Sequence, residues 1–144
     1  MKFGLRVLII DDDEVFHLIH TKILTATGFA AQVKSALNGR QGLEVLLKDI
    51  ASAMPPQLVL VDLQMPVFNG FDFLEALRGL RTEIRGDIFV SVLSSSNTLL
   101  DREKAFNLGA NAYLQKPLSI FELKAAMGFI GEALNETPEV NTNI

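Results

Sequence analysis

Cysteine is absent from the 144-residue sequence, which excludes disulfide bonds and thiolate metal sites and gives no sign of an oxidising compartment. Long apolar runs are absent as well, and no segment reaches the length that spanning a bilayer requires. The apolar run at the start of the chain ends at Asp11, before it could serve as the core of a signal peptide. We therefore expect a soluble, cytoplasmic protein.

Positive charge is scarce, with 13 Lys and Arg residues against 17 Asp and Glu residues and a net charge of −4. Affinity for nucleic-acid phosphates depends on clustered basic side chains, so this balance argues against a nucleic-acid-binding protein. Hydrophobic residues make up 49% of the chain and charged residues 21%, which is typical of a globular protein rather than a disordered one.

The chain has the length of one ordinary domain and shows no internal repeat, low-complexity tract or second domain. The last residues, NETPEVNTNI, are polar and lack the spacing of a packed helix. We expect one folded domain over residues 1–134 and a frayed polar tail over residues 135–144.

Short β-like runs alternate strictly with longer helical ones along the chain. Parallel strands need helical crossovers, so this alternation predicts an α/β fold with a parallel sheet and helices on both faces. The expected strands cover residues 5–10, 30–36, 58–61, 88–93 and 111–115. The expected helices cover residues 14–27, the segment after Gly39, about 70–80, a segment that ends at Leu108, and 119–134.

Apolar spacing predicts which helical residues face the core. His17 and His20 lie one turn apart on the first helix, and we interpret them as surface histidines rather than metal ligands or phosphate carriers. The expected apolar face of that helix consists of Phe16, Ile19, Ile23 and Leu24. On the last two helices most of the large apolar residues are expected in the core, and any exposed one would join a partner-binding face; they are Phe106, Phe121, Phe129 and Ile130.

Polar side chains follow four of the predicted strands at the point where each strand ends. Asp11 and Asp12 follow the first strand, and Asp62 follows the third. Ser94 and Lys116 follow the fourth and fifth strands. Ligand sites of open parallel sheets lie at the carboxyl ends of the strands, so we expect these side chains to meet at one rim.

The residue types at this rim indicate phosphoryl chemistry. Three carboxylates suit a hard divalent cation, and Mg²⁺ prefers one or two carboxylates together with waters and a phosphate oxygen. If the metal holds a phosphoryl donor, one carboxylate can act as nucleophile and become an aspartyl phosphate. The Ser94 hydroxyl could hydrogen-bond one phosphoryl oxygen, and the Lys116 ammonium could pair with another.

Four motifs, IIDDDE, LVLVDLQMPVFNG, VLSSS and AYLQKP, together resemble the receiver domain of two-component response regulators over about residues 5–134. The resemblance implies a flavodoxin-like, doubly wound (βα)5 fold with strand order 2-1-3-4-5. It also implies a stand-alone phosphorylation switch. Such a domain assists its own phosphorylation from small donors and its own dephosphorylation, but it is not primarily an enzyme.

The resemblance assigns a role to each acidic residue of the rim. By this resemblance Asp62 accepts the phosphoryl group from a histidine kinase. Asp11 and Asp12 bind Mg²⁺ together with Asp62 and the main-chain carbonyl of Gln64. The side chains of Gln64 and Ser96 stand at positions that influence how fast the acyl phosphate hydrolyses.

The remaining rim residues correspond to the family's hydroxyl, lysine and aromatic positions. Ser94 is the hydroxyl residue, and Lys116 precedes Pro117 through a peptide bond that is commonly cis in the family. Tyr113 is the aromatic residue that swings inward as the hydroxyl moves toward the phosphate. The implied partners are a sensor histidine kinase or phosphotransfer protein and an unidentified downstream protein, with the chain as a monomer or weak homodimer.

Two other interpretations remain open from the residues. IIDDDEV also resembles the signature of haloacid-dehalogenase-type phosphatases, with Asp11 as nucleophile and Asp13 as acid, although Asp13 and Glu14 are better explained as helix N-terminal residues. That interpretation leaves DLQMPVFNG without a role. The third interpretation is a receiver-like interaction module that is not phosphorylated.

Overall fold

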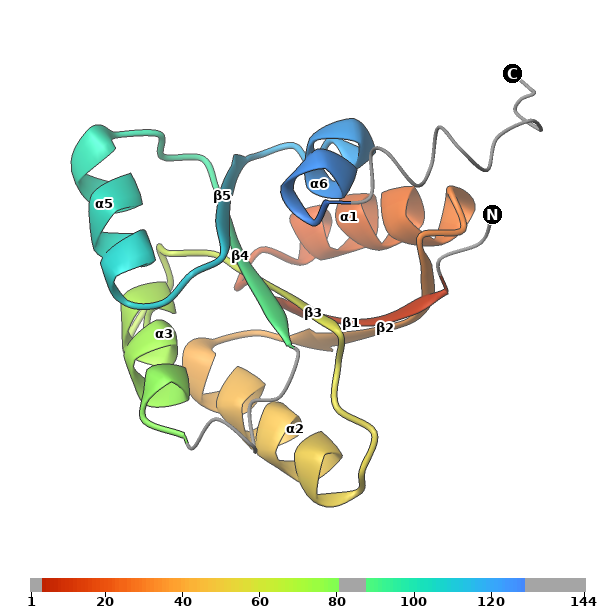
Figure 1. The fold of residues 1–144 in the computed structure, drawn as a ribbon, viewed down its shortest axis with the longest axis horizontal. Coiled ribbons are helices and arrows are strands. Elements are labelled where there is room, and N and C mark those ends of the chain that lie inside the picture. The colour runs from red at the N-terminus through yellow and green to blue at the C-terminus, as the bar shows by residue number, and fades with distance from the viewer. Residues whose placement is uncertain (1–3, 81–87, 129–144) are drawn as a thin grey trace.

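Five parallel strands form one sheet in the order β2-β1-β3-β4-β5, in a computed structural model that describes residues 4–80 and 88–128. The predicted fold class and strand order are confirmed (Figure 1). Within the described ranges, no helix combines the length and apolarity needed to cross a bilayer. The strands are β1 (Leu5–Ile10), β2 (Ala30–Ala36), β3 (Leu58–Val61), β4 (Phe89–Ser94) and β5 (Ala112–Gln115), and the helices are α1 (Glu14–Ala26), α2 (Gly39–Ala51), α3 (Gly70–Arg78), α5 (Leu99–Asn107) and α6 (Ile120–Ala126).

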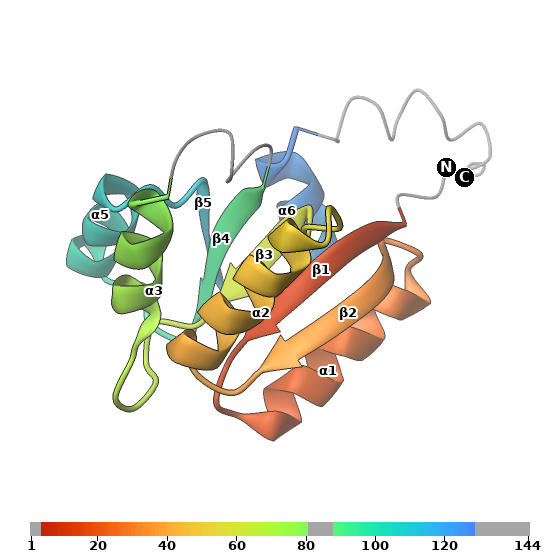
Figure 2. The same cartoon turned by 90° about the horizontal axis from the view of Figure 1, so that it is seen from below.

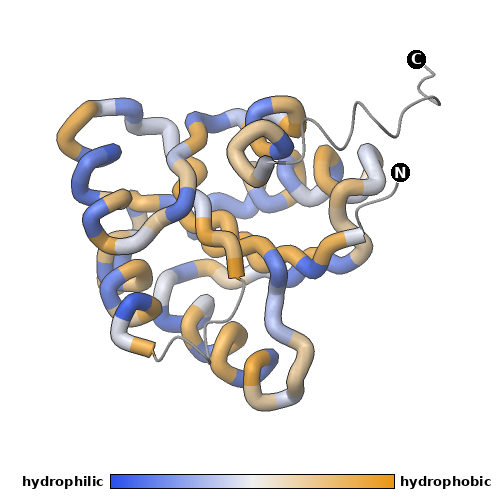
Figure 3. The backbone as a smooth tube through the Cα atoms, viewed as in Figure 1, coloured by the Kyte–Doolittle hydropathy of each residue, from blue (hydrophilic) through white to orange (hydrophobic). Residues whose placement is uncertain are grey.

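Helices cover both faces of the sheet, with α1 and α6 on one side and α2, α3 and α5 on the other (Figures 1 and 2). Successive side chains of a strand point to opposite faces. In β1, Leu8 and Ile10 belong to the cluster under α2 and α3, whereas Val7 and Ile9 belong to the cluster under α1 and α6. The central strands are therefore apolar on both faces, as their colour in Figure 3 shows.

The boundaries differ from the expected ones most at the end of the described chain. β4 and β5 each begin one residue later than expected. The closing helix was expected to continue to residue 134, but α6 ends at Ala126 and Gly128 has a left-handed φ of 80°. Phe129, Ile130 and the predicted tail 135–144 lie outside the described residues.

The expected buried face of α1 is only partly correct. Leu24 is fully buried, but Ile19 is 39% exposed. The prediction that His17 and His20 lie on the surface is wrong, because their side chains are buried with exposed fractions of 7% and 0%. These two histidines and Leu24 share one face of the helix, where a polar ring can be buried only if it finds hydrogen-bond partners.

Both histidines find backbone partners on other segments. The His17 Nε2–H donates to the carbonyl oxygen of Asp11 at 2.6 Å, and the carbonyl oxygen of Ala36 lies 3.1 Å from the same nitrogen. The His20 Nε2 accepts the backbone N–H of Leu118 at 3.2 Å. The rings therefore join α1 to the ends of β1 and β2 and to the segment after β5.

The expected burial of the aromatic residues on the last two helices is also wrong for those that the structure describes. Phe106 is 43% exposed and Phe121 is 69% exposed. On α5 the buried residue is the small Ala105, while Leu99 and Leu100 are 70% and 74% exposed. This helix contacts the sheet through a narrow stripe and leaves large apolar side chains in solvent.

Gly70 allows the loop after β3 to close tightly onto the end of that strand. Its backbone N–H donates to the Leu63 carbonyl at 3.2 Å. A Cβ at this position would collide with the Asp62 carbonyl oxygen and would lie 2.8 Å from the Leu63 Cα. Because these are backbone atoms, no side-chain rotation relieves the clash.

We predict that Gly70→Ala lowers the free energy of unfolding by about 2 kcal/mol, because the clash must shift the backbone of Asp62. The matched control is Gly79→Ala, where the nearest atom to a new Cβ lies 3.4 Å away and the backbone is right-handed with φ −73°. Urea unfolding measures both values. Equal stability of Gly70→Ala and the wild type would contradict the prediction.

Burial of His20 predicts a pH dependence of stability. Burial, and next the nearby charge of Lys116, lower the pKa of His20 from its ordinary value of 6.5 to about 4, while Asp11 opposes the shift and His17 adds to it. Between pH 6.5 and 4 the unfolded chain binds more protons at this residue than the folded one, so stability falls as the pH falls.

We predict that the wild type loses up to about 3 kcal/mol more unfolding free energy than His20→Gln between pH 7 and pH 4, since the variant has no group to titrate. Urea unfolding at a series of pH values measures this difference. Parallel pH profiles for the two proteins would show that the ring is not held neutral by the fold.

Candidate functional site

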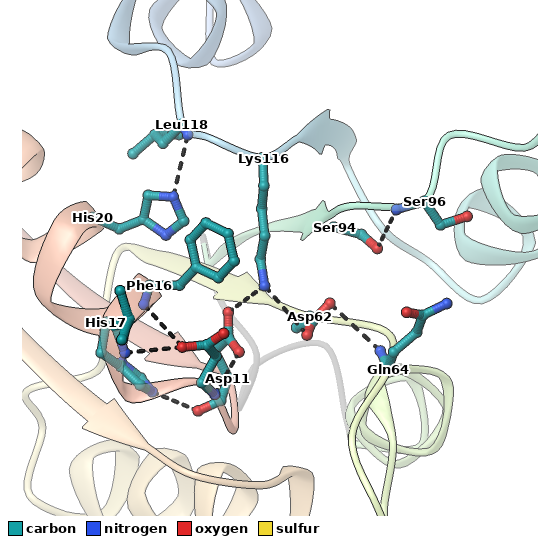
Figure 4. Close-up of polar contacts among 12 residues, drawn as sticks. Asp11, Phe16, His17, His20, Asp62, Gln64, Ser94, Ser96, Lys116 and Leu118 are labelled. Atoms are coloured by element: carbon teal, nitrogen blue, oxygen red, sulfur yellow. Dashed lines mark hydrogen bonds and ion pairs between the residues drawn. The ribbon is translucent and has the colours of Figure 1, made fainter.

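Strand pairing brings the predicted rim residues together. The Asp62 backbone N–H donates to the Ile10 carbonyl at 2.9 Å, which sets the start of the β3–α3 loop beside the end of β1. On the other side, the Lys116 backbone N–H donates to the Ser94 carbonyl at 2.9 Å. Parallel strands carry their C-terminal ends to one edge, so residues distant in sequence surround one space (Figure 4).

Asp11, Asp12 and Asp62 form a compact carboxylate cluster. Each offers one oxygen such that the three oxygens lie within 4.8 Å of one another. Asp11 and Asp62 are 2% and 7% exposed, and Asp12 is exposed to solvent. Three hard oxygen ligands, one of them open to solvent, fit a divalent cation that keeps several waters.

The Lys116 ammonium lies between the two buried carboxylates. Its Nζ is 2.6 Å from Asp11 Oδ2 and 3.3 Å from Asp62 Oδ2, and only 5% of the Lys116 side chain is exposed. Figure 4 shows the side chain reaching from β5 across to the ends of β1 and β3. The peptide bond between Lys116 and Pro117 is cis. The single positive charge of Lys116 thus pairs with the carboxylates of both Asp11 and Asp62, and the cluster retains a net negative charge.

Burial raises the pKa of Asp62 above its ordinary value, and the neighbouring negative charge of Asp11 acts in the same direction. The positive charge of Lys116 and the N–H of Gln64, 3.4 Å from Asp62 Oδ1, act against this rise without cancelling it. A poorly solvated carboxylate with a raised pKa is a more basic and more nucleophilic group than a solvated one.

Ser94 is fully buried at the end of β4. Its Oγ accepts the backbone N–H of Ser96 at 3.1 Å, so its own hydroxyl hydrogen stays available for another acceptor. The adjacent Ser96 Oγ donates to Asp101 Oδ2 at 2.7 Å, which ties the β4–α5 loop to the start of α5.

Tyr113 lies inside the molecule rather than in solvent, with 6% of its surface exposed. Its hydroxyl donates to the Ser96 carbonyl at 2.8 Å. The guanidinium carbon of Arg102 lies 5.0 Å from the centre of the Tyr113 ring. The aromatic residue of β5 therefore contacts the loop that follows Ser94.

Two residues next to the site were not identified from the sequence as part of it. The Phe16 ring lies 4.3 Å from Lys116 Nζ on one side and stacks on the His20 ring on the other, with 5.4 Å between the ring centres. The available signal was their i, i+4 spacing on a helix, which places two rings in contact.

The start of α1 agrees with the predicted capping role of Asp13, because the Asp13 side chain accepts the N–H groups of Val15 and Phe16.

Comparison with known proteins identifies the family. The family model of the response regulator receiver domain matches residues 7–128. The chain is 33% identical over 130 residues to the probable chemotaxis protein CheY of Rhizobium etli, across 90% of this chain and 95% of that protein. It is 34% identical over 133 residues to the photosynthetic apparatus regulatory protein RegA of Cereibacter sphaeroides. This alignment covers 92% of this chain but only 66% of that relative.

Solved structures show the same fold. A two-component response regulator from Cytophaga hutchinsonii matches with a TM-score of 0.80 and 26% identity, across 94% of this chain and 100% of that one. The receiver domain of the histidine kinase CKI1 from Arabidopsis thaliana matches with a TM-score of 0.79 and 19% identity, across 90% of this chain and 93% of that one.

The family match covers most of β1 and all of β3, β4 and β5, and it includes the DLQMPVFNG loop, which the phosphatase interpretation left without a role. The haloacid dehalogenase alternative is therefore set aside. The geometry of the rim and these likenesses lead to one conclusion: the chain belongs to the response regulator receiver domain family of two-component systems, whose members are phosphoacceptor signalling domains rather than enzymes in the ordinary sense.

Proposed function

We propose that the chain is a signalling switch that accepts a phosphoryl group on Asp62 from a sensor histidine kinase or a phosphotransfer protein. The observation that carries this proposal is the Lys116 ammonium shared between Asp11 and Asp62 at the buried rim. A lysine so placed neutralises part of the charge of the acceptor and stands ready for a phosphoryl oxygen.

In the transfer step an oxygen of the Asp62 carboxylate attacks the phosphorus of a phosphohistidine. The P–N bond breaks, and the imidazole keeps the electron pair and takes up a proton. Lys116 then exchanges its contact with Asp62 for a contact with a phosphoryl oxygen. Its Nζ lies 3.3 Å from Asp62 Oδ2 before the transfer, so the ammonium is already close to the group that is modified. The free hydroxyl hydrogen of Ser94 is the donor for a second phosphoryl oxygen.

The carboxylate cluster supports Mg²⁺ as the cofactor, held by Asp11, Asp12, Asp62 and the main-chain carbonyl of Gln64. When bound, the cation would neutralise negative charge on the transferred phosphoryl group. Asp12 supports this role because it is the exposed carboxylate of the cluster, so water-bearing ions can reach it.

Tyr113 and the β4–α5 loop supply the response to phosphorylation. If Ser94 turns its hydroxyl toward a phosphoryl oxygen, the loop shifts with it, and the Tyr113 hydroxyl bonded to Ser96 follows. The exposed Leu99, Leu100 and Phe106 of α5 lie next in the chain, and we assign them to a face for a downstream protein partner. The protein acts in the cytoplasm as a monomer or a weak homodimer in this proposal.

We predict that incubation with acetyl phosphate and Mg²⁺ adds a single phosphoryl group to the wild type, seen by intact-mass spectrometry. Asp62→Asn should abolish the added mass, and a chelator should abolish it in the wild type. Lys116→Met should slow the reaction about 100-fold, because the developing charge loses its buried cation.

The matched control for this experiment is Asp49→Asn, which removes a carboxylate of α2 that pairs with Lys34 and should leave the added mass unchanged. Modification of Asp62→Asn would show that the acceptor is another residue. Absence of the added mass from every protein, including with a purified histidine kinase as donor, would favour the interaction module that is not phosphorylated.

We further predict that phosphorylation changes the tyrosine fluorescence of the protein. Tyr113 is the only tyrosine and the chain has no tryptophan, so the emission reports on this residue alone. Acetyl phosphate with Mg²⁺ should change the emission of the wild type but not of Asp62→Asn. Ser94→Ala should be phosphorylated about 10-fold more slowly and show a smaller change, as expected for the loss of one hydrogen bond. An unchanged emission in the phosphorylated wild type would remove Tyr113 from the switch.

A further inference from the structure

The rim is braced from one side by two aromatic rings of α1. The Phe16 ring centre lies 4.3 Å from Lys116 Nζ, and the opposite face of this ring is stacked on His20, with 13° between the two ring planes. Figure 4 shows the three side chains in this order, above the carboxylates of Asp11 and Asp62. The stack therefore lies against one side of the ammonium.

The stack is also attached to the backbone that carries the lysine. His20 Nε2 accepts the N–H of Leu118, two residues beyond Lys116, at 3.2 Å. Leu118 is 5% exposed, so its N–H would have no water to bond if the histidine acceptor were removed. Helix α1 thus contacts the Lys116 ammonium through Phe16 and the backbone at Leu118, two residues later, through His20.

A histidine at this buried position requires an explanation beyond packing. The ring is fully buried and its Nδ1 makes no hydrogen bond among the described residues, so burial of this polar group is only partly compensated. A leucine would fill a buried helix face without that cost. What the histidine offers and a leucine lacks is a neutral acceptor for the Leu118 N–H, and the lowered pKa of about 4 keeps the ring neutral at physiological pH.

A lysine side chain depends more than most on contacts that restrict its conformation. Its stem has four rotatable bonds, and holding it in one conformation costs about 2 kcal/mol of side-chain entropy. An ammonium attracted only by Asp11 and Asp62 could move along the carboxylates. The aromatic face attracts the cation and limits its approach from that side. A displacement of about 1 Å in a reacting group costs on the order of 100-fold in rate.

We propose that Phe16 and His20 are positioning residues that hold Lys116 for phosphorylation of Asp62, Phe16 through its ring face and His20 through Phe16 and the Leu118 N–H. The inference rests on the proposed function, because it concerns the rate at which Asp62 is modified. It adds two residues of α1 that act through Lys116.

The test compares four variants with acetyl phosphate and Mg²⁺ as the probe. Phe16→Leu and His20→Leu remove the ring face and the acceptor, whereas Phe16→Tyr and His20→Gln retain an aromatic face and an acceptor. The time course of phosphorylation at several donor concentrations separates the maximal rate constant from the donor concentration at half-maximal rate. The matched control is Leu18→Ala, because Leu18 lies on the same helix and is 64% exposed.

We expect the maximal rate constant to fall 10- to 100-fold in the two leucine variants, with the half-saturating donor concentration changed less than twofold. Phe16→Tyr and His20→Gln should recover most of this loss, and Leu18→Ala should match the wild type. Thermal unfolding checks that each variant is folded, and the recovery by His20→Gln keeps the test valid if His20→Leu is unstable.

Nuclear magnetic resonance supplies a second measurement in the protein without donor. Ring currents of Phe16 should shift the ε-methylene protons of Lys116 upfield in the wild type, and His20→Leu should reduce that shift if it releases the ring. Wild-type rate constants in both leucine variants would overturn the inference while leaving Asp62 as acceptor. Absence of modification in the wild type itself would overturn the proposed function and the inference with it.

Discussion

A buried lysine placed between two buried carboxylates is the interaction on which the rim of this sheet depends. Asp11 and Asp62 end neighbouring strands, and without Lys116 their charges would repel each other in a poorly solvated space. One ammonium does not neutralise this cluster once Asp12 is included. The remaining negative charge makes the rim receptive to a further cation, and burial raises the pKa of Asp62.

The loops around the cluster are shaped by contacts that serve the same group. Gly70 lets the β3–α3 loop return onto the backbone of Asp62, and at the outer end of this loop Val67 has a left-handed φ of 69° and is 97% exposed. A β-branched residue in this conformation is strained by about 1–3 kcal/mol. On the other side Ser94, Ser96 and Tyr113 form a series of hydrogen bonds from the rim to β5. The Ser96 side chain continues this series to Asp101 at the start of α5.

Helix α1 contributes to the site through its buried face rather than through its N-terminus alone. Asp13 caps the helix, His17 bonds the carbonyl of Asp11, and Phe16 with His20 lies against Lys116. The cap is local to α1, whereas the His17 contact links the helix to the end of β1 and the Phe16 contact links it to the residue that follows β5. The helix thereby fixes the separation between β1, which carries Asp11, and β5, which leads to Lys116.

Much of the architecture was determined by the sequence alone, for a local physical reason. Branched apolar runs such as LRVLII and LVLV are typical of strands buried on both faces, and their alternation with helices predicts a parallel sheet with its polar residues at one edge. This reasoning identified Asp11, Asp12, Asp62, Ser94 and Lys116, which the fold brings to the same rim. The tertiary structure decided what depends on partners distant in sequence. Burial of His20 is partly compensated because its Nε2 accepts the N–H of Leu118, 98 positions away. Phe106 and Phe121 are exposed because their helices meet the sheet through smaller residues. Helical spacing states which residues share a face, but only packing decides which face is covered.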